Sequence, residues 1–309
     1  MSRRQDWVWS EHQLAKLQKT QAIIAELDEY KPLTVRAVYY QFVAKGLIEN
    51  THSQFTMISS LLKWARIDGF IPWADIEDRH RIFHDFSGWG DVDGFVDAHI
   101  NNFLSRYRRN LQRGQERYLE IWVEKDALSP IFEKVAEPFR IPLVIDRGSL
   151  SVSFLNNYRR RVNAVGADSP VILYFGDFDP SGVAIPRDMA VTLVDELNVE
   201  RLEIDRVALN QEDIAKYRLP HDEKAVKAKD CRSSAFLEEY GAVAVELDAL
   251  PPAILKAKVQ AAIGKYLDVA TFEAERKIEA VELAKANRMR KAAVTAFKKI
   301  RTVEEKGTN

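Results

Sequence analysis

Two carboxylates, Asp177 and Asp179, are the residues whose types and spacing most clearly suggest chemistry. They follow an apolar run at residues 171–175, which predicts a buried strand that ends before Pro180 and Gly182. Alternate residues of an extended segment point to the same side, so the two carboxylates repel each other unless a cation lies between them. Ligation by oxygen alone suits Mg²⁺. An ordinary turn is the alternative, because Asp, Pro, Ser and Gly are turn formers.

A third carboxylate follows another strand-like run at residues 118–123. This run ends in Glu124, with Lys125 directly after it. The carboxyl ends of parallel strands meet at one edge of a sheet, where ligand sites form. The sequence therefore predicts that Glu124, Asp177 and Asp179 together hold Mg²⁺.

These motifs resemble the Toprim domain of topoisomerases, bacterial primases and related nucleases. They are most similar to the A subunit of topoisomerase VI and to its relative, the transesterase that makes meiotic double-strand breaks. The loop at residues 147–153 departs from the family, because the family's usual Pro and Thr-Arg pair are missing there. The residues that carry the resemblance are Glu124, Lys125, Arg147, Gly148, Asp177, Asp179, Pro180 and Gly182.

A second motif, Thr34-x-Arg36-x-x-Tyr39-Tyr40, also resembles that family. Thr34 is placed to cap a helix over residues 34–46, in which Arg36 and Tyr40 share one face. The resemblance implies that Tyr40 is a nucleophile that attacks a DNA phosphate. Arg36 would hold that phosphate or lower the pKa of the phenol. The alternative is that Tyr39 and Tyr40 are core residues of a small helical domain.

The resemblance has further implications for cofactor and partners. It implies that Mg²⁺ is held by Glu124, Asp177 and Asp179, and that Glu124 can instead act as a general acid or base. It also implies a homodimer that binds double-stranded DNA, in which the tyrosine of one protomer meets the metal site of the other. An ATPase B-type subunit would complete a topoisomerase.

The fold class expected is α/β, with an N-terminal winged-helix-like domain, a Toprim domain and a long C-terminal helix. Three helices over residues 11–65 and an extended piece near residue 70 favour the winged helix, with a helical bundle as competitor. Alternating apolar strands and helices predict a mainly parallel sheet. The expected boundaries are 1–90 for the DNA-binding domain, 91–268 for the metal-binding domain and 269–309 for the tail.

Three other segments carry charge. Residues 95–118 predict an arginine-studded helix that either contacts DNA or is a solvated face. The tail at 272–303 predicts a helix with a basic second half, either solvated or an arm on DNA or a partner. Glu246 lies near the end of a predicted strand at 242–247 and Asp248 directly after it, and both are expected to be structural, capping the next helix.

The composition fits a chain of two compact domains, with 309 residues, a net charge of -1 and 46% hydrophobic residues. The single cysteine, Cys231, excludes an internal disulfide framework and is expected to be a small buried residue in a reducing cytosol. No apolar run is long enough to span a bilayer and no secretory signal is present, so a cytoplasmic protein is expected. Neither a zinc motif nor an ATP-binding P-loop occurs.

The sequence thus favours Mg²⁺-dependent DNA strand cleavage by tyrosine transesterification, as in a type IIB topoisomerase A subunit. A Toprim nuclease that uses metal-activated water is the first alternative. A DNA-binding protein without catalysis, in which the carboxylates only structure a turn, is the second.

Overall fold

The computed structural model describes residues 9–76, 88–146, 151–166, 168–220 and 233–307. The chain divides into two compact units, the first made of residues 1–81 and 116–266 and the second of residues 82–115 and 267–309. The first unit thus contains both the N-terminal helices and the sheet. The boundaries expected from the sequence stay a prediction.

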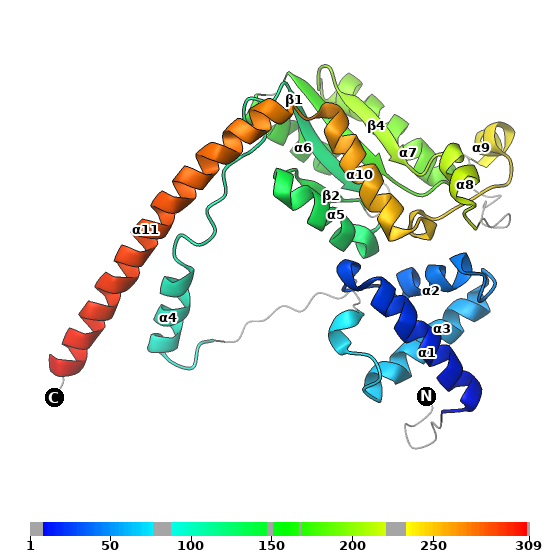
Figure 1. Ribbon diagram of the computed structural model, residues 1–309. Helices are drawn as coiled ribbons and strands as arrows, with labels where there is room; N and C mark the ends of the chain where they lie inside the picture. The colour runs from blue at the N-terminus through cyan, green and yellow to red at the C-terminus, as the bar shows by residue number, and fades with distance from the viewer. Residues whose placement is uncertain (1–8, 77–87, 147–150, 167, 221–232, 308–309) are drawn as a thin grey trace. The chain divides into compact units, whose positions relative to one another are not determined.

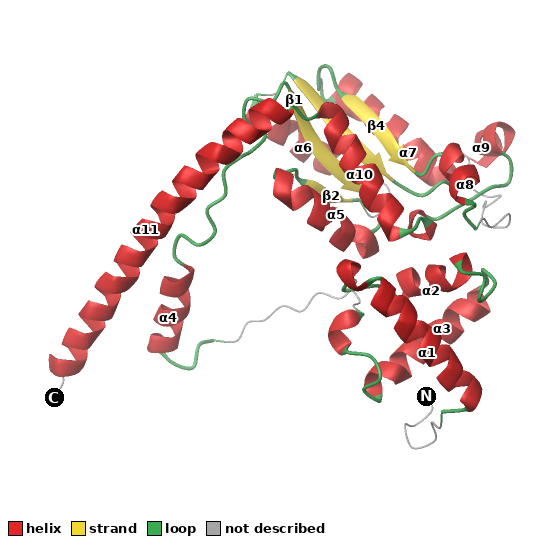
Figure 2. Ribbon diagram, in the orientation of Figure 1, coloured by secondary structure: helices red, strands yellow, loops and turns green. Residues whose placement is uncertain are grey.

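A four-stranded parallel sheet forms the centre of the first unit (Figure 2). Its strands are β1 (Arg117–Val123), β2 (Leu143–Ile145), β3 (Ser169–Phe175) and β4 (Glu203–Ala208), in the spatial order β2-β1-β3-β4. All three pairings are parallel. The interiors of β1 and β3 are buried on both faces, which explains their nearly continuous apolar sequences. The α/β class with a parallel sheet is confirmed.

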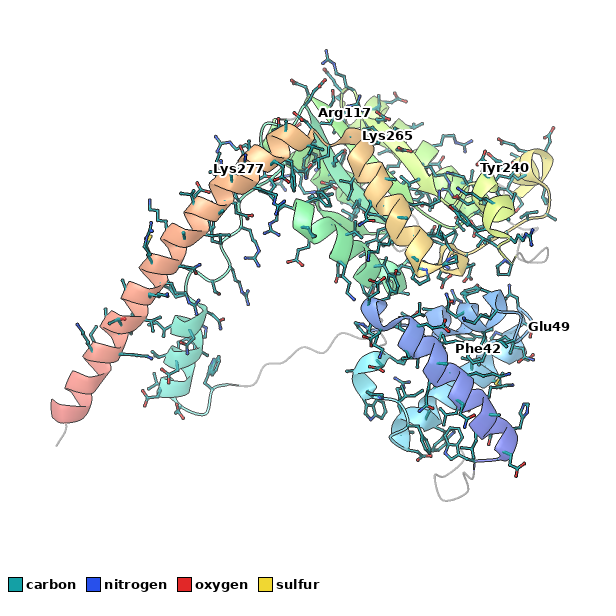
Figure 3. The ribbon with its side chains drawn as sticks, viewed as in Figure 1. Phe42, Glu49, Arg117, Tyr240, Lys265 and Lys277 are labelled. Carbon is teal, nitrogen blue, oxygen red and sulfur yellow. The ribbon has the colours of Figure 1, made fainter. Side chains whose placement is uncertain are left out.

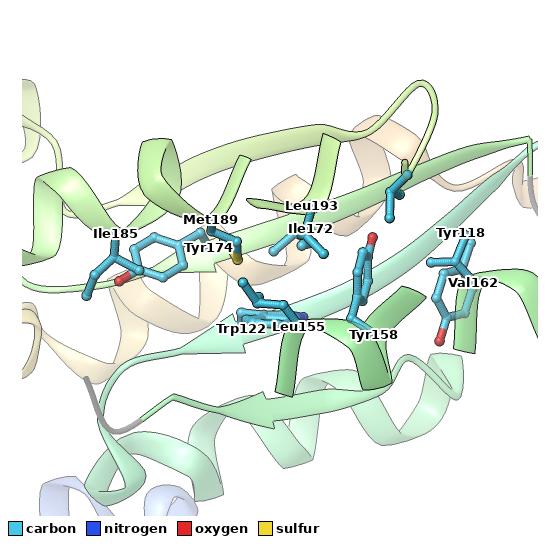
Figure 4. Close-up of a cluster of buried hydrophobic side chains, with 11 residues drawn as sticks. Tyr118, Trp122, Leu155, Tyr158, Val162, Ile172, Tyr174, Ile185, Met189 and Leu193 are labelled. Atoms are coloured by element: carbon cyan, nitrogen blue, oxygen red, sulfur yellow. The ribbon is translucent and has the colours of Figure 1, made fainter. Parts of the chain in front are cut away.

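Helices cover both faces of this sheet (Figure 1). On one face, α6 (Val152–Val165) and α7 (Pro180–Val191) enclose an aromatic core that includes Trp122, Tyr158 and Tyr174 (Figure 4). On the other, α5 (Ser129–Ala136) places Phe132 against Phe175, with ring centroids 4.8 Å apart, and α10 (Pro252–Tyr266) packs beside it. The strands are therefore held from both sides, and their carboxyl ends are fixed relative to each other.

The segment between β4 and α10 differs from the prediction. Helices α8 (Gln211–Tyr217) and α9 (Ser233–Tyr240) lie here. The expected strand at residues 242–247 is wrong, because Val245 makes only an isolated antiparallel bridge with Phe178. A short 3₁₀ turn, Leu247–Ala249, follows directly.

The N-terminal part of the first unit is helical. It contains α1 (Glu11–Glu26), α2 (Val35–Ala44) and α3 (His52–Ile67), and the predicted cap is confirmed because Thr34 Oγ1 accepts a hydrogen bond from the Ala37 amide. Among the described residues of this part, a parallel bridge joins Leu33 to Ile76 and no strand forms. The winged helix therefore stays a prediction.

The second unit contains α4 (Val92–Asn102) and α11 (Val269–Gly307). The C-terminal helix is confirmed, whereas the helix expected over residues 95–118 is wrong in its second half, which is turn and coil before β1 begins. The reason is tertiary pairing. Arg109 forms ion pairs with Glu275 and Glu282 of α11, and its backbone amide donates to Glu279. This arginine is thus committed to carboxylates within the unit.

Several expectations fall on residues outside the described ranges, namely Arg147, Gly148 and the burial of Cys231. Within the ranges that are described, no helix combines the length and apolar character needed to cross a membrane.

Candidate functional site

The strand order creates a switch point between β1 and β3. From β1 the chain crosses to β2 on one side, and from β2 it returns to β3 on the other. In open α/β sheets, ligands bind outside the carboxyl ends of strands at such a point. Here the Glu124 amide donates to the Phe175 carbonyl at 3.0 Å, so Glu124 and the loop that begins at Gly176 lie side by side.

The three carboxylates predicted to hold Mg²⁺ are located at this edge, but each accepts a backbone hydrogen bond. Glu124 Oε2 accepts from the Asp177 amide at 2.9 Å, and Asp177 Oδ1 accepts from the Leu247 amide at 2.7 Å. Asp179 Oδ1 accepts from the Gly182 amide at 2.7 Å and so caps α7. These carboxylates thus stabilise the local backbone, as the ordinary-turn alternative to a metal site expected.

Negative charge is concentrated at this edge of the sheet. Burial is the main cause that raises the pKa of Glu124, and the nearby carboxylates Asp179 and Asp146 add to it. Burial also raises the pKa of Asp177 to about 6, against the opposing effect of the Lys125 ammonium.

The donor chemistry of the three carboxylates suits Mg²⁺, but their arrangement does not present a ready site. Within the described ranges, no group of three or more His, Cys, Asp or Glu side chains is placed to hold a metal ion. The reason lies in the contacts, because both oxygens of Asp177 are already used, one by the Leu247 amide and the other by Lys125 at 3.2 Å. The arrangement therefore does not fit a three-carboxylate Mg²⁺ centre, and the metal stays a prediction.

The ammonium of Lys125 occupies the centre of a different acidic cluster. Its Nζ lies 3.2 Å from Asp177 Oδ2, 3.1 Å from Glu246 Oε2 and 3.1 Å from Asp248 Oδ1. Burial disfavours the charged ammonium, but the three carboxylates outweigh it and raise the pKa of Lys125. A lysine cation thus pairs with Asp177, one of the three carboxylates for which the sequence suggested a metal.

Helix α2 brings both candidate residues of the second motif to this cluster. Tyr40 Oη donates to Glu246 Oε2 at 3.0 Å, and Arg36 Nη1 lies 2.8 Å from the same oxygen. Arg36 Nε is also 3.7 Å from Asp248 Oδ2. The i, i+4 spacing accounts for this, since both side chains leave one face of the helix. The sequence prediction that Arg36 and Tyr40 act at one place is therefore consistent with their shared contact.

The neighbouring Tyr39 has a different environment. Its hydroxyl donates to Asn50 Oδ1 at 2.8 Å and to the Thr51 carbonyl at 3.2 Å, and its ring packs edge-on against Phe55. Both tyrosine rings are buried, as the core alternative expected. They differ in that only the hydroxyl of Tyr40, of the two, meets a carboxylate.

Glu246 and Asp248 are the functional candidates that the sequence interpretation missed. Glu246 precedes the 3₁₀ turn without a capping side-chain hydrogen bond, and its expected role as a cap of the following helix stays a prediction. Both carboxylates take part in the ion pairs with Arg36 and Lys125. The available signal was their spacing, which repeats that of Asp177 and Asp179.

The charges of the cluster shift its proton equilibria in opposite directions. Burial, together with the negative charges of Asp248 and Glu246, raises the pKa of the Tyr40 phenol. Burial would also raise the pKa of Glu246, but Lys125 and Arg36 outweigh it and hold that pKa below its usual value. At neutral pH, Tyr40 is therefore protonated and Glu246 is a carboxylate.

Arg206 of β4 fixes the backbone of the loop from Gly176 to Gly182. Its guanidinium donates to the carbonyls of Gly182 at 2.7 Å, Asp177 at 2.6 Å and Leu209 at 3.0 Å. Gly182 is required for a close approach, because a Cβ there would lie 2.2 Å from the Asp177 carbonyl oxygen. The loop that carries Asp177 and Asp179 is thus held by a half-buried cation that the sequence did not single out.

No protein-family model matches this chain, and no curated protein matches it in sequence. The residues of the site itself must therefore indicate the function. They provide a phenol, a carboxylate that accepts its hydrogen bond, and two cations beside that carboxylate.

Proposed function

We propose that this protein cleaves double-stranded DNA by tyrosine transesterification, with Tyr40 as the nucleophile. The Tyr40 oxygen would form a bond to a backbone phosphorus, and the bond from that phosphorus to a sugar oxygen would break. One strand end becomes linked to Tyr40, and the other is released as a hydroxyl. The resemblance to the topoisomerase VI A subunit supports this reaction.

The observation that carries the proposal is that Tyr40, Arg36 and Lys125 all contact the same oxygen of Glu246. A phosphodiester that reaches Tyr40 comes within reach of both cations. A guanidinium can bind two phosphate oxygens and stabilise the charge that grows on them in the transition state. Glu246 and Arg36 are about 40% exposed, with side-chain values of 39% and 43%, so this side of the cluster is accessible.

The only support for Mg²⁺ dependence in this proposal is the sequence resemblance to the topoisomerase VI A subunit. Since the carboxylates do not form a three-ligand group, the attack and the stabilisation of charge are assigned to the side chains of Tyr40 and Arg36. Glu124 remains a candidate general acid or base at the same edge of the sheet. The homodimer, the ATPase B-type partner and the cytoplasmic location stay predictions.

A covalent-trapping assay tests the proposal. Purified protein is incubated with internally labelled supercoiled DNA and Mg²⁺, denatured in detergent and resolved on a gel. We expect label on the wild-type protein and on Tyr39→Phe, and none on Tyr40→Phe. Tyr39→Phe is the matched control because its ring is equally buried and adjacent in sequence. Label on Tyr40→Phe would contradict the proposal.

A hydrolytic Toprim nuclease is the second candidate. It is favoured by the concentration of buried carboxylates at the switch point, where the pKa values of Asp177 and Glu124 are raised by burial and, less strongly, by neighbouring carboxylates. In the same assay it predicts cut DNA with free ends, unaffected by Tyr40→Phe and lost in Asp177→Ala. A DNA-binding protein without catalysis predicts binding without cuts in any variant.

A further inference from the structure

Glu246 is the one group of the cluster that contacts the proposed nucleophile directly through a hydrogen bond, among the residues that the structure describes. Its Oε2 atom accepts from Tyr40 Oη at 3.0 Å and also lies 2.8 Å from Arg36 Nη1 and 3.1 Å from Lys125 Nζ. One carboxylate oxygen thus has three donors around it. This geometry matches a nucleophile paired with a base, in which the base is oriented by further groups.

We propose that Glu246 is the general base that takes the phenolic proton of Tyr40 in the same chain, and that the incoming DNA phosphate activates it. This inference rests on the proposed function and assigns a role within it. In the resting protein, Arg36 and Lys125 hold Glu246 as a weakly basic carboxylate. A bound phosphodiester competes for both cations, and Glu246 becomes more basic as they turn toward the phosphate.

Exposure selects Glu246 over the other carboxylates of the cluster. The Glu246 side chain is 39% exposed, whereas the side chains of Asp177 and Asp248 are 13% and 1% exposed. DNA can therefore approach the Glu246 side of the cluster, while Asp177 and Asp248 stay behind Lys125 as its fixed counter-charges. Neither of these two forms a hydrogen bond to Tyr40 among the interactions of the described residues.

The proton and bond changes balance without an added reactant. The Oη–H bond of Tyr40 breaks as the Oη–P bond forms, and the proton moves to Glu246. The bond from phosphorus to the sugar oxygen breaks, and that oxygen takes a proton from water. Glu246 then returns its proton to water, so no net proton is consumed and nothing is oxidised or reduced.

A matched control lies at the opposite end of the sheet. There Tyr266 donates to Glu203, and Arg117 pairs with Glu203 at 2.9 Å, so the same three kinds of group meet away from the site. Figure 3 shows the labelled Arg117 and Lys265 at this end. Glu203→Gln therefore removes a carboxylate bonded to a tyrosine and an arginine without changing the proposed machinery.

The pairing is tested first without DNA, by ¹⁹F NMR of protein labelled with 3-fluorotyrosine. The signal of residue 40 is the one lost in Tyr40→Phe. We expect Glu246→Gln to move this signal and Glu203→Gln to leave it in place. A signal of residue 40 that is the same in Glu246→Gln and wild type would overturn the pairing.

The base role is tested next by the single-turnover rate of adduct formation. We expect Glu246→Gln to slow it by about 100-fold or more, the usual contribution of a positioned base, with Glu246→Asp in between and Glu203→Gln unchanged. Adduct formation by Glu246→Gln at the wild-type rate would overturn the base role and leave the transesterase intact. If Glu246→Gln moves the NMR signal as expected but the wild-type protein forms no adduct, the proposed function is refuted, and the base role with it.

Mixing two inactive variants tests whether base and nucleophile belong to one chain. Tyr40→Phe is mixed with Glu246→Gln under conditions that allow subunit exchange, and adduct formation is measured. Pairing within one chain predicts no recovery, because every chain in the mixture lacks one of the two groups. Recovery of adduct in the mixture would overturn pairing within one chain.

Discussion

Two clusters in the first unit, one around Glu120 and one around Glu246, each combine a glutamate with a tyrosine and an arginine but differ in exposure. In the core, Glu120 of β1 accepts from Tyr118 at 2.7 Å and from both Arg161 Nε and Nη2 at 2.8 Å. At the site, Glu246 accepts from Tyr40 and pairs with Arg36. The Glu120 side chain is 0% exposed and that of Glu246 is 39% exposed.

The comparison shows that the groups alone do not indicate a reactive site. Glu120 is saturated, since Trp122 also donates to it at 3.0 Å, and its partners Tyr118 and Trp122 belong to the packed layer beneath α6. No ligand can enter there without unfolding that layer. Glu246 has similar partners at the end of the sheet, where its cations can be drawn to a ligand. The exposure of the carboxylate to solvent therefore distinguishes the structural ion pair of Glu120 from the candidate catalytic pair of Glu246.

We expect the largest difference between the two clusters when the arginine of each is removed and the free energy of unfolding is measured. Arg161→Ala leaves Glu120 buried without its counter-charge, which we expect to cost about 3–5 kcal/mol in the free energy of unfolding. Arg36→Ala removes a half-exposed pair and should cost about 1 kcal/mol or less. Urea unfolding of the two variants measures both. Equal losses would contradict the distinction.

The pH dependence of the site provides the next test. Burial raises the pKa of Asp248 from an ordinary value of 3.8 to about 6, against the opposing effect of Lys125. Between these two values the folded protein binds a proton that the unfolded chain has released, so the contribution to stability falls as the pH rises through this window. The loss amounts to about 3 kcal/mol, at about 1.4 kcal/mol per pKa unit.

Asp248→Asn removes this titration. We expect the stability of wild type relative to Asp248→Asn to fall between pH 4 and 6 and then to stay level, as measured by urea unfolding across this range. Asp188→Asn, at an exposed position of α7, serves as the control. A difference between wild type and Asp248→Asn that does not change with pH would show that Asp248 titrates normally.

A third arginine, Arg206, contacts backbone carbonyls, so it tests how an arginine that holds a loop differs from one that pairs with a carboxylate. Arg206 is half-buried, as Arg161 is, but its partners are loop carbonyls and not a carboxylate. Arg206→Lys keeps the charge and loses the planar donors, and we expect it to cost about 1–3 kcal/mol as buried carbonyls lose partners. Faster hydrogen exchange of the Gly182 amide would locate that loss in the loop. Unchanged exchange would mean that the loop is held by other contacts.

The sequence was sufficient for the elements that depend on local pattern. Apolar runs located β1 and β3, and Thr34 located the start of α2. It failed at residues 103–116, where Arg109 pairs with carboxylates of α11 and the backbone lies in turns and coil. It also failed at 242–247, where a mostly apolar run makes an isolated bridge and not a strand.

The chain by itself determined which residues of the two motifs are candidates for chemistry, because residue type and local spacing are properties of the sequence. Tyr40 and Arg36 share a helix face through their spacing, and Glu124 and Asp177 reach one edge through the parallel strands that precede them. Only the tertiary structure decided what these groups touch. Glu246 lies 206 residues from Tyr40, and Lys125 compensates carboxylates from two distant segments. Such contacts depend on how helices and strands pack, which local spacing does not encode.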